Sequence, residues 1–150
     1  MSALDPTTIE RTLELRCFIN SARMCALIFK TASRYASRIS ISRGGAVTEV
    51  SLGLMTLMMT ADGEVQEGEL PSPVVKITVS GLDASAAMDA ILDLFPPDGG
   101  PERCASPGCN NPAVLVGPDG EGVFAYRCTM SSVDQAHQWK VTTKIPKSQP

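Results

Sequence analysis

Three cysteines and one histidine in the C-terminal part of the chain have side chains that can bind a metal ion. Cys104 and Cys109 enclose a Pro-Gly pair, which predicts a turn between the two sulfurs, and Cys128 and His137 follow at wider spacing. Three thiolates and one imidazole make a complete tetrahedral ligand set for Zn²⁺. We therefore predict that Cys104, Cys109, Cys128 and His137 form a structural zinc site.

The segment between the two halves of this set supports the prediction. Residues 114–116 and 123–127 have strand-like sequences on either side of Gly-Pro-Asp-Gly, so a β-hairpin is expected to return Cys128 toward the first cysteines. A tail with few large apolar groups would also gain stability from a bound metal. Because the Cys104–Cys109 spacing is wider than the common Cys-x₂-Cys, a chance occurrence of four such residues stays open as the alternative.

A serine stands at the start of a predicted helix. Ser21, like Asn20 before it, is a suitable N-cap, because its side-chain oxygen can accept a backbone N–H of the first turn. The only histidine, His137, is far away in sequence.

Composition and charge exclude several classes of function. The net charge of −3 gives no general attraction to nucleic acid or to an anionic membrane, and no apolar run is long enough to cross a bilayer. The N-terminus lacks the features of a signal peptide, so a cytoplasmic location is expected. Thiols stay reduced there, so Cys17 and Cys25 are expected to be core residues rather than disulfide partners. No catalytic acid/base pair, activated nucleophile or Gly-rich phosphate loop is visible, and an enzyme is not expected.

Hydrophobic periodicity predicts the elements that must position these residues. Their order is β-α-β-β-α-β-α, with elements at 12–18, 22–35, 38–43, 46–50, 51–59, 74–80 and 83–95. Helices on one side of a four-stranded, mainly antiparallel sheet would give an α+β open-faced sandwich. The Pro- and Gly-rich run that begins at Pro96 marks a boundary. We expect a domain at 12–95, a linker at 96–103 and a small Cys-rich β extension at 104–150.

Three details of these elements are also predicted. The first helix is expected to bury the face made by Ala22, Cys25, Ala26, Phe29 and Ala32. Asp83 is expected to cap the last helix. Trp139 is expected to be a packing anchor, with the basic residues around and after it in a solvated tail.

The segment 19–32, Ile-Asn-Ser-Ala-Arg-Met-Cys-Ala-Leu-Ile-Phe-Lys-Thr-Ala, resembles the active-site segment of the histidine-containing phosphocarrier proteins of the sugar phosphotransferase system, the HPr family. In that family a Gly-Leu-His-Ala-Arg-Pro loop runs into an apolar helix. Ser21 aligns with the phosphate-accepting histidine and Met24 with the proline. Further likeness lies at 53–57 and 81–83, and the resemblance implies the same open-faced sandwich over about 12–95.

The resemblance also implies which chemistry has been lost. In the family, the histidine accepts phosphate from a phosphoenolpyruvate-dependent enzyme, while the helix N-terminus and the arginine stabilise the dianion. Here Arg23 keeps the anion-binding role, but an ester on Ser21 would be too stable to relay phosphate. The expected function is a regulatory or adaptor module whose partners are proteins, such as phosphotransferase components or a regulatory kinase. Two alternatives stay open: a zinc-binding interaction protein with the HPr fold as its scaffold, and a phosphocarrier that uses His137.

Members of the family also carry a regulatory serine at the start of a short second helix. Ser51 is the nearest candidate for phosphorylation, and a simple helix cap is the alternative reading. Leu52, Met55 and Met58 follow it, and together with Arg23 they form the predicted partner surface, since Met-rich patches adapt to several partners. Packing in the core is the alternative for these apolar residues.

Overall fold

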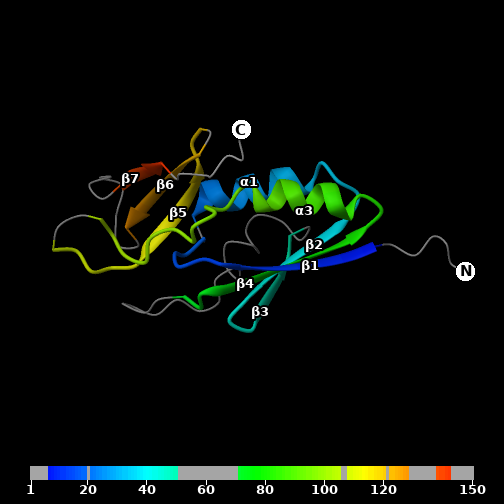
Figure 1. Ribbon diagram of the computed structural model, residues 1–150, viewed down its shortest axis with the longest axis horizontal. Helices are drawn as coiled ribbons and strands as arrows, with labels where there is room; N and C mark the ends of the chain where they lie inside the picture. The colour runs from blue at the N-terminus through cyan, green and yellow to red at the C-terminus, as the bar shows by residue number, and fades with distance from the viewer. Residues whose placement is uncertain are drawn as a thin grey trace, which may run out of the picture.

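The first part of the chain folds into a sheet covered by two helices. The computed structural model describes residues 7–19, 21–50, 71–105, 108–120, 122–128 and 138–142. Within them, four antiparallel strands lie in the order β1-β4-β2-β3: β1 (Thr7–Glu14), β2 (Arg38–Arg43), β3 (Ala46–Glu49) and β4 (Val74–Gly81). Helices α1 (Ala22–Ala32) and α3 (Ala84–Leu92) cover one face of this sheet (Figure 1). The predicted α+β open-faced sandwich is confirmed.

Alternating β-branched residues explain the two central strands. The residues of β4 that point toward the helices are fully buried: Val75, Ile77 and Val79. Strand β2 buries Ile39 and Ile41 in the same way. Gly44 and Gly45, with φ of 58° and 91°, then turn the chain into β3, because a two-residue hairpin of this kind needs positive φ at both positions.

The first strand lies earlier in the chain than its sequence suggested. Strand β1 pairs with β4 from Thr7 to Glu14, and it ends before the apolar residues that predicted a strand at 12–18. Leu15 and Cys17 are fully buried, but they enter the core from an irregular segment. Alternation detected the burial of these residues correctly and misplaced the strand, because a buried turn and a buried strand present the same pattern.

The buried face of α1 is also different from the predicted one. The helix ends at Ala32 rather than near Tyr35, and it buries Met24, Cys25, Ile28 and Thr31. Ala22, Ala26 and Phe29, expected on the inner face, are exposed. Apolar residues surround most of this helix, so spacing alone does not decide which side is buried.

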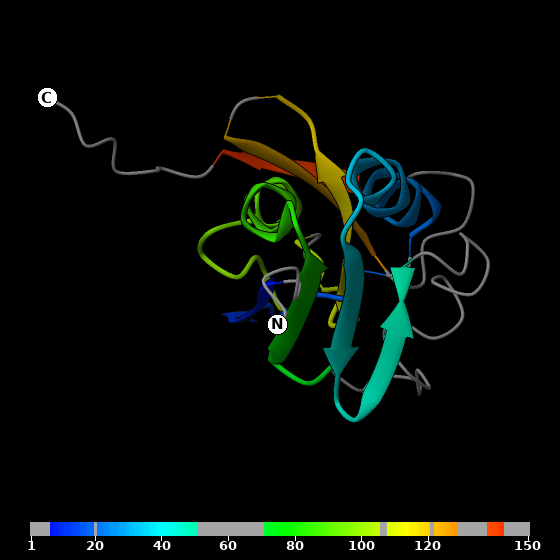
Figure 2. The same cartoon turned by 90° about the vertical axis from the view of Figure 1, so that its right-hand side faces the viewer.

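The C-terminal part forms a second, smaller sheet. Its strands are β5 (Ala113–Pro118), β6 (Val123–Cys128) and β7 (Gln138–Thr142), all antiparallel and in that order. The predicted hairpin corresponds to β5 and β6, whereas β7 was not expected. Trp139 of β7 stacks on Tyr126 with ring centroids 5.8 Å apart, which confirms its packing role. Figures 1 and 2 show this sheet beside one end of α1.

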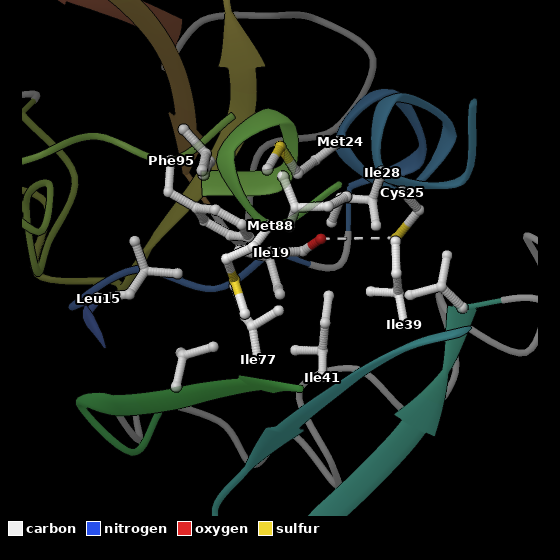
Figure 3. Packing of buried hydrophobic residues seen from close by; sticks show 14 of the residues in the cluster. Leu15, Ile19, Met24, Cys25, Ile28, Ile39, Ile41, Ile77, Met88 and Phe95 are labelled. Carbon is white, nitrogen blue, oxygen red and sulfur yellow. Dashed lines mark hydrogen bonds between the residues drawn. The ribbon is translucent and has the colours of Figure 1, made fainter. Parts of the chain in front are cut away.

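One hydrophobic cluster runs through both sheets. It contains Ile28 of α1 and Ile77 of β4 together with Leu115 and Tyr126 of the small sheet. Figure 3 shows Met88 of α3 above Ile77 of β4, and Ile28 and Cys25 of α1 on the side of Ile39 of β2. The extension therefore shares its core with the first part instead of hanging from it.

The Pro- and Gly-rich segment after α3 is packed against the end of β1. The backbone N–H of Arg16 donates to the Gly99 carbonyl (2.8 Å), and its guanidinium donates to the Asp98 carbonyl (2.7 Å). At Gly100 (φ 72°) a Cβ would lie 3.1 Å from the Cys17 sulfur, so glycine permits the close approach.

Part of the predicted interaction surface lies outside the described residues. This applies to the predicted helix at 51–59, which holds Ser51, Leu52, Met55 and Met58. In the part of the chain that the structure describes, no helix has the length and apolarity needed to span a bilayer.

Candidate functional site: a covered serine loop and a cysteine cluster

Ser21 lies at the first turn of α1 and caps it. Its backbone is extended (φ −78°, ψ 149°), and its Oγ accepts the N–H of Met24 at 3.1 Å, as the sequence predicted. The Ser21 carbonyl accepts the N–H of Cys25, which begins the helical ladder. The side chain thus satisfies one of the first-turn donors that every helix leaves without an internal partner.

The extension covers this serine. Ser21 is 4% exposed, and its hydroxyl donates to the Leu115 carbonyl of β5 at 2.9 Å. The hydroxyl therefore donates one hydrogen bond to a backbone carbonyl and accepts another from a backbone N–H. Its oxygen is turned into the protein rather than toward solvent.

Strand β5 is fixed to the loop before α1 by a short parallel bridge. Phe18 pairs with Val114; its N–H donates to the Ala113 carbonyl (2.9 Å), and its carbonyl accepts the N–H of Leu115 (2.7 Å). Further along β5, a Cβ on Gly117 would lie 2.8 Å from the Leu27 side chain of α1. The ladder bulges between Leu115 and Gly117, and this irregularity lets β5 lie close against the helix.

Arg23, the predicted anion-binding residue, contacts the extension. Its guanidinium donates to the Pro118 carbonyl (3.1 Å) and lies 3.8 Å from the Asp119 carboxylate. Lys140 pairs with the same carboxylate at 2.6 Å; this lysine lies in strand β7 rather than in a tail, but its side chain is 65% exposed. The hydrogen bond and charge of Lys140, with a smaller effect from Arg23, lower the pKa of Asp119. The protein's own carboxylate thus neutralises the cationic group beside Ser21.

Arg23 nevertheless stays accessible from one side. Its side chain is 48% exposed and borders a groove of about 670 Å³ that residues of the small sheet also line. Asp119, Trp139 and Lys140 also line this groove. The groove combines an aromatic surface with both signs of charge, but it does not contain the Ser21 hydroxyl.

Three of the four predicted metal ligands lie together at one end of the small sheet. The sulfurs of Cys104, Cys109 and Cys128 are all within 4.8 Å of one another, and those of Cys109 and Cys128 are 3.6 Å apart. Bonds of about 2.3 Å in a tetrahedral zinc site place sulfurs ~3.8 Å apart, so the spacing suits zinc. Cys128 is fully buried, Cys104 nearly so, and Cys109 is half-buried. The fourth predicted ligand, His137, lies outside the described residues.

The surroundings of Cys109 favour a thiolate. The backbone N–H of Asn111 has the largest effect, and bonds from Cys104, Cys128 and the Asn111 amide add to it, so that the pKa of Cys109 falls to about 7. A thiolate is the form that binds a metal. Cys17 and Cys25 are fully buried elsewhere in the core, as predicted for residues without a metal-binding role.

Sequence reasoning did not identify the residues that cover the loop. Leu115 acts through its backbone carbonyl, which no side-chain pattern reveals, and Asp119 was assigned only to a hairpin turn. Asp83 occupies the N-cap position of α3, as predicted, but its side chain makes no capping hydrogen bond and instead accepts the backbone N–H groups of Ala36 and Ser37. The only sequence signal that β5 covers the Ser21 loop is Gly117. A glycine inside a strand is typical of a bulge or a close approach.

Comparison with protein families identifies the family of this chain. The chain matches the family model for the PTS HPr component phosphorylation site over residues 20–96. No curated protein matches it. A phosphocarrier protein HPr from Bacillus anthracis is 23% identical, with 57% of this chain and 93% of that chain covered and a TM-score of 0.45. HPr-C-His from Thermoanaerobacter tengcongensis is 27% identical, with 63% and 98% covered and a TM-score of 0.44. Since the family model spans more than half of its length, the chain belongs to the HPr family.

Proposed function

We propose that this HPr-family chain does not relay phosphate and acts in the cytoplasm as a regulatory or adaptor module that binds other proteins. The observation that carries the proposal is the state of the Ser21 hydroxyl, at the position that the resemblance assigns to the phosphoacceptor histidine. It is 4% exposed, it caps α1 through Met24, and it donates to the Leu115 carbonyl.

The chemistry of this arrangement argues against phosphate transfer. A serine attacks phosphorus only if a base removes its proton, and a backbone carbonyl, which holds the proton of Ser21, is not such a base. A phosphoryl donor must also approach the oxygen, and β5 occupies that approach. Loss of the imidazole and burial of the hydroxyl act in the same direction.

Proteins are the expected partners. Proteins of the HPr family interact with other phosphotransferase proteins, and we propose phosphotransferase components or a regulatory kinase as partners of this chain. Arg23, with its half-exposed side chain, is the described member of the proposed surface. Leu52, Met55 and Met58 are its other proposed members, and Ser51 is the proposed phosphorylation site, favoured by the stabilisation of a phosphate at a helix N-terminus.

Phosphoenolpyruvate and the matching phosphotransferase enzyme test this proposal directly. A histidine-containing HPr protein, as positive control, should gain acid-labile phosphate, and this chain should gain none. Labile phosphate on the chain would contradict the proposal. If that label disappeared in His137→Ala, the chain would be a phosphocarrier that uses His137.

A zinc-binding interaction protein is the second candidate function. One observation favours it: three cysteine sulfurs lie within 4.8 Å of one another. Metal analysis of the purified protein should give close to one zinc per chain if His137 and the three cysteines bind it, and Cys109→Ser should abolish this zinc. The two functions are compatible, because the cysteine cluster and the Ser21 loop are different sites.

A further inference from the structure

We propose that a zinc ion bound by Cys104, Cys109 and Cys128 clamps the extension over the Ser21 loop, so that metal occupancy controls how firmly the loop is covered. The inference deepens the proposed function and rests on it, since it explains what keeps the former phosphate-transfer site closed. It goes beyond a structural zinc site because it couples the metal to a distant loop.

The three cysteines join segments that are separate in the chain. Cys104 and Cys109 lie before β5, and Cys128 is the last residue of β6. The segment around Cys104 is already paired with the start of the small sheet, because its N–H donates to the Asn111 carbonyl (2.8 Å) and the neighbouring Arg103 bridges Pro112. A metal bound to all three sulfurs would therefore tie both strands of the hairpin to one point.

A short series of backbone bonds leads from this point to the serine. Cys128 lies opposite Ala113 in the β5–β6 ladder. The Ala113 carbonyl accepts the N–H of Phe18 (2.9 Å), and two residues further along β5 the Leu115 carbonyl accepts the Ser21 hydroxyl (2.9 Å). Any change that frees the Cys128 end of the hairpin thus acts first on the strand that covers Ser21.

The chemistry of the site indicates zinc rather than a hard cation. All three donors are sulfurs, which favour zinc and softer metals and do not suit Mg²⁺ or Ca²⁺. Two of the cysteines are at least nine-tenths buried, and Cys109 is half-buried, which leaves an entry path for the ion. The Cys109–Cys128 separation of 3.6 Å is close to that expected for two ligands of one zinc ion.

Amide hydrogen exchange of the reduced, full-length protein tests the clamp. Exchange is measured by mass spectrometry after EDTA treatment and again after addition of Zn²⁺, with metal content determined in parallel. One zinc per chain should bind. The amides of Met24 and Leu115 should exchange more slowly with zinc, by on the order of 100-fold when free zinc is about 100 times its Kd and opening requires metal release.

Two variants separate the clamp from general effects of a lost cysteine. In Cys109→Ser, zinc should no longer slow exchange at Met24 and Leu115. Cys25→Ala also removes one cysteine, but from the core away from the cluster, and it should keep the full response to zinc. A loss of response in both variants would show that the effect is not specific to the cluster and would overturn the clamp.

The remaining outcomes are equally decisive. Absence of zinc binding, or zinc binding without slower exchange in the Ser21 loop, overturns the clamp and leaves the proposed loss of phosphate relay intact. A disulfide between Cys109 and Cys128 in the protein as isolated from cells under non-reducing conditions would also overturn it. Acid-labile phosphate on the chain, by contrast, would overturn the proposed function without affecting zinc binding.

Discussion

The main sheet with its helices and the small sheet are stabilised in different ways. The main sheet pairs β1 with β4 over the whole length of both strands, and it buries a continuous set of apolar residues beneath α1 and α3. The small sheet has three short strands. It is attached by backbone hydrogen bonds to Phe18, by the bond from the Ser21 hydroxyl to Leu115, and by its share of the same core. The side-chain pattern of the main sheet is thus sufficient to form its core, whereas the small sheet depends on its contacts with the main domain.

Under the proposed function, this difference explains how a chain of the HPr family could lose an exposed phosphate-transfer site without losing its structure. The loop at Ser21 keeps the helix cap that the main fold needs. The Ser21 hydroxyl also donates its proton to the Leu115 carbonyl of the extension. The extension in addition provides Asp119 as a partner for Arg23. Groups that suit an external anion in the family are thus satisfied within the chain.

The strongest test of the comparison is a substitution in the shared core. Ile77 is fully buried in β4, and Ile77→Ala should lower the free energy of unfolding by about 2–5 kcal/mol because it removes buried methyl groups and leaves a cavity. Since the cluster includes both sheets, the two regions should still unfold together. Fluorescence of Trp139, the only tryptophan, reports on the small sheet, and circular dichroism reports on the whole chain.

Lys76→Ala, in the same strand but exposed, is the matched control and should cost less than about 1 kcal/mol, the value of an exposed pair such as Lys76–Glu10. If the Trp139 transition came at a clearly lower denaturant concentration than the loss of secondary structure, the two regions would be independent units and the shared core would carry little coupling.

Removing the Ser21 hydroxyl should have the next largest effect. Ser21→Ala deletes the cap on Met24 and leaves the Leu115 carbonyl without this partner, so a loss of about 2–3 kcal/mol is expected in chemical denaturation. Ser33→Ala removes an exposed hydroxyl at the other end of α1, where it donates to Lys30, and should cost below about 0.5 kcal/mol. Equal losses for the two variants would mean that the bond to β5 contributes nothing.

The two regions also differ in how far sequence could predict them. Alternation in β4 and the Gly-Gly turn after β2 are local signals, and they placed β2, β3 and β4 correctly, whereas β1 was expected too late in the chain. Strand β7 was missed because its alternating residues, such as Trp139, are only partly buried and follow a long polar stretch. The rotation of α1 was missed since almost every side of the helix is apolar, and its buried side depends on which elements it meets.

For the candidate site, side-chain chemistry was predictable and docking was not. Cysteine spacing with a hairpin between the pairs was enough to bring Cys104, Cys109 and Cys128 together. The cap at Ser21 followed from residue type alone. Nothing local in the sequence specifies that a backbone carbonyl of β5 faces Ser21, because such a contact depends on the placement of one sheet against another helix.

Close packing of β5 against α1 should give a smaller effect than the serine. Gly117→Ala places a Cβ 2.8 Å from Leu27 at a φ of 140°, and a cost of about 1–3 kcal/mol is expected. Gly120→Ala is matched in backbone strain, with a φ of 119°, but no atom lies within 4 Å of its Cβ. Only Gly117→Ala should speed amide exchange at Met24. Faster exchange in both variants would show that backbone strain after the substitution, and not the contact of Gly117 with α1, loosens β5 over the Ser21 loop.

The smallest effect is expected for two aspartates that tie loops in the two regions. Hydrogen bonds from Ser37 and from the Ala36 backbone lower the pKa of Asp83, and Lys140, followed by Arg23, lowers that of Asp119. Both folded pKa values lie below the ordinary value of about 3.9. Each carboxylate therefore stabilises the fold above that pH, and the contribution is lost as pH falls through the folded pKa.

Salt should distinguish the charged partners that lower the pKa of Asp119 from the uncharged hydrogen-bond donors that lower the pKa of Asp83. The screening length falls from about 10 Å at 0.1 M to about 3 Å at 1 M salt, so the pKa of Asp119 should rise toward its ordinary value. The pKa of Asp83 should hardly move, because its partners are uncharged. Carboxyl NMR titrations at both salt concentrations measure this, and Lys140→Met should raise the pKa of Asp119 alone. Equal salt-induced changes in the two pKa values would mean that charge does not hold the extension at Arg23. The hydrogen bonds of Ser21 and Phe18 would then account for the attachment of β5 over the loop.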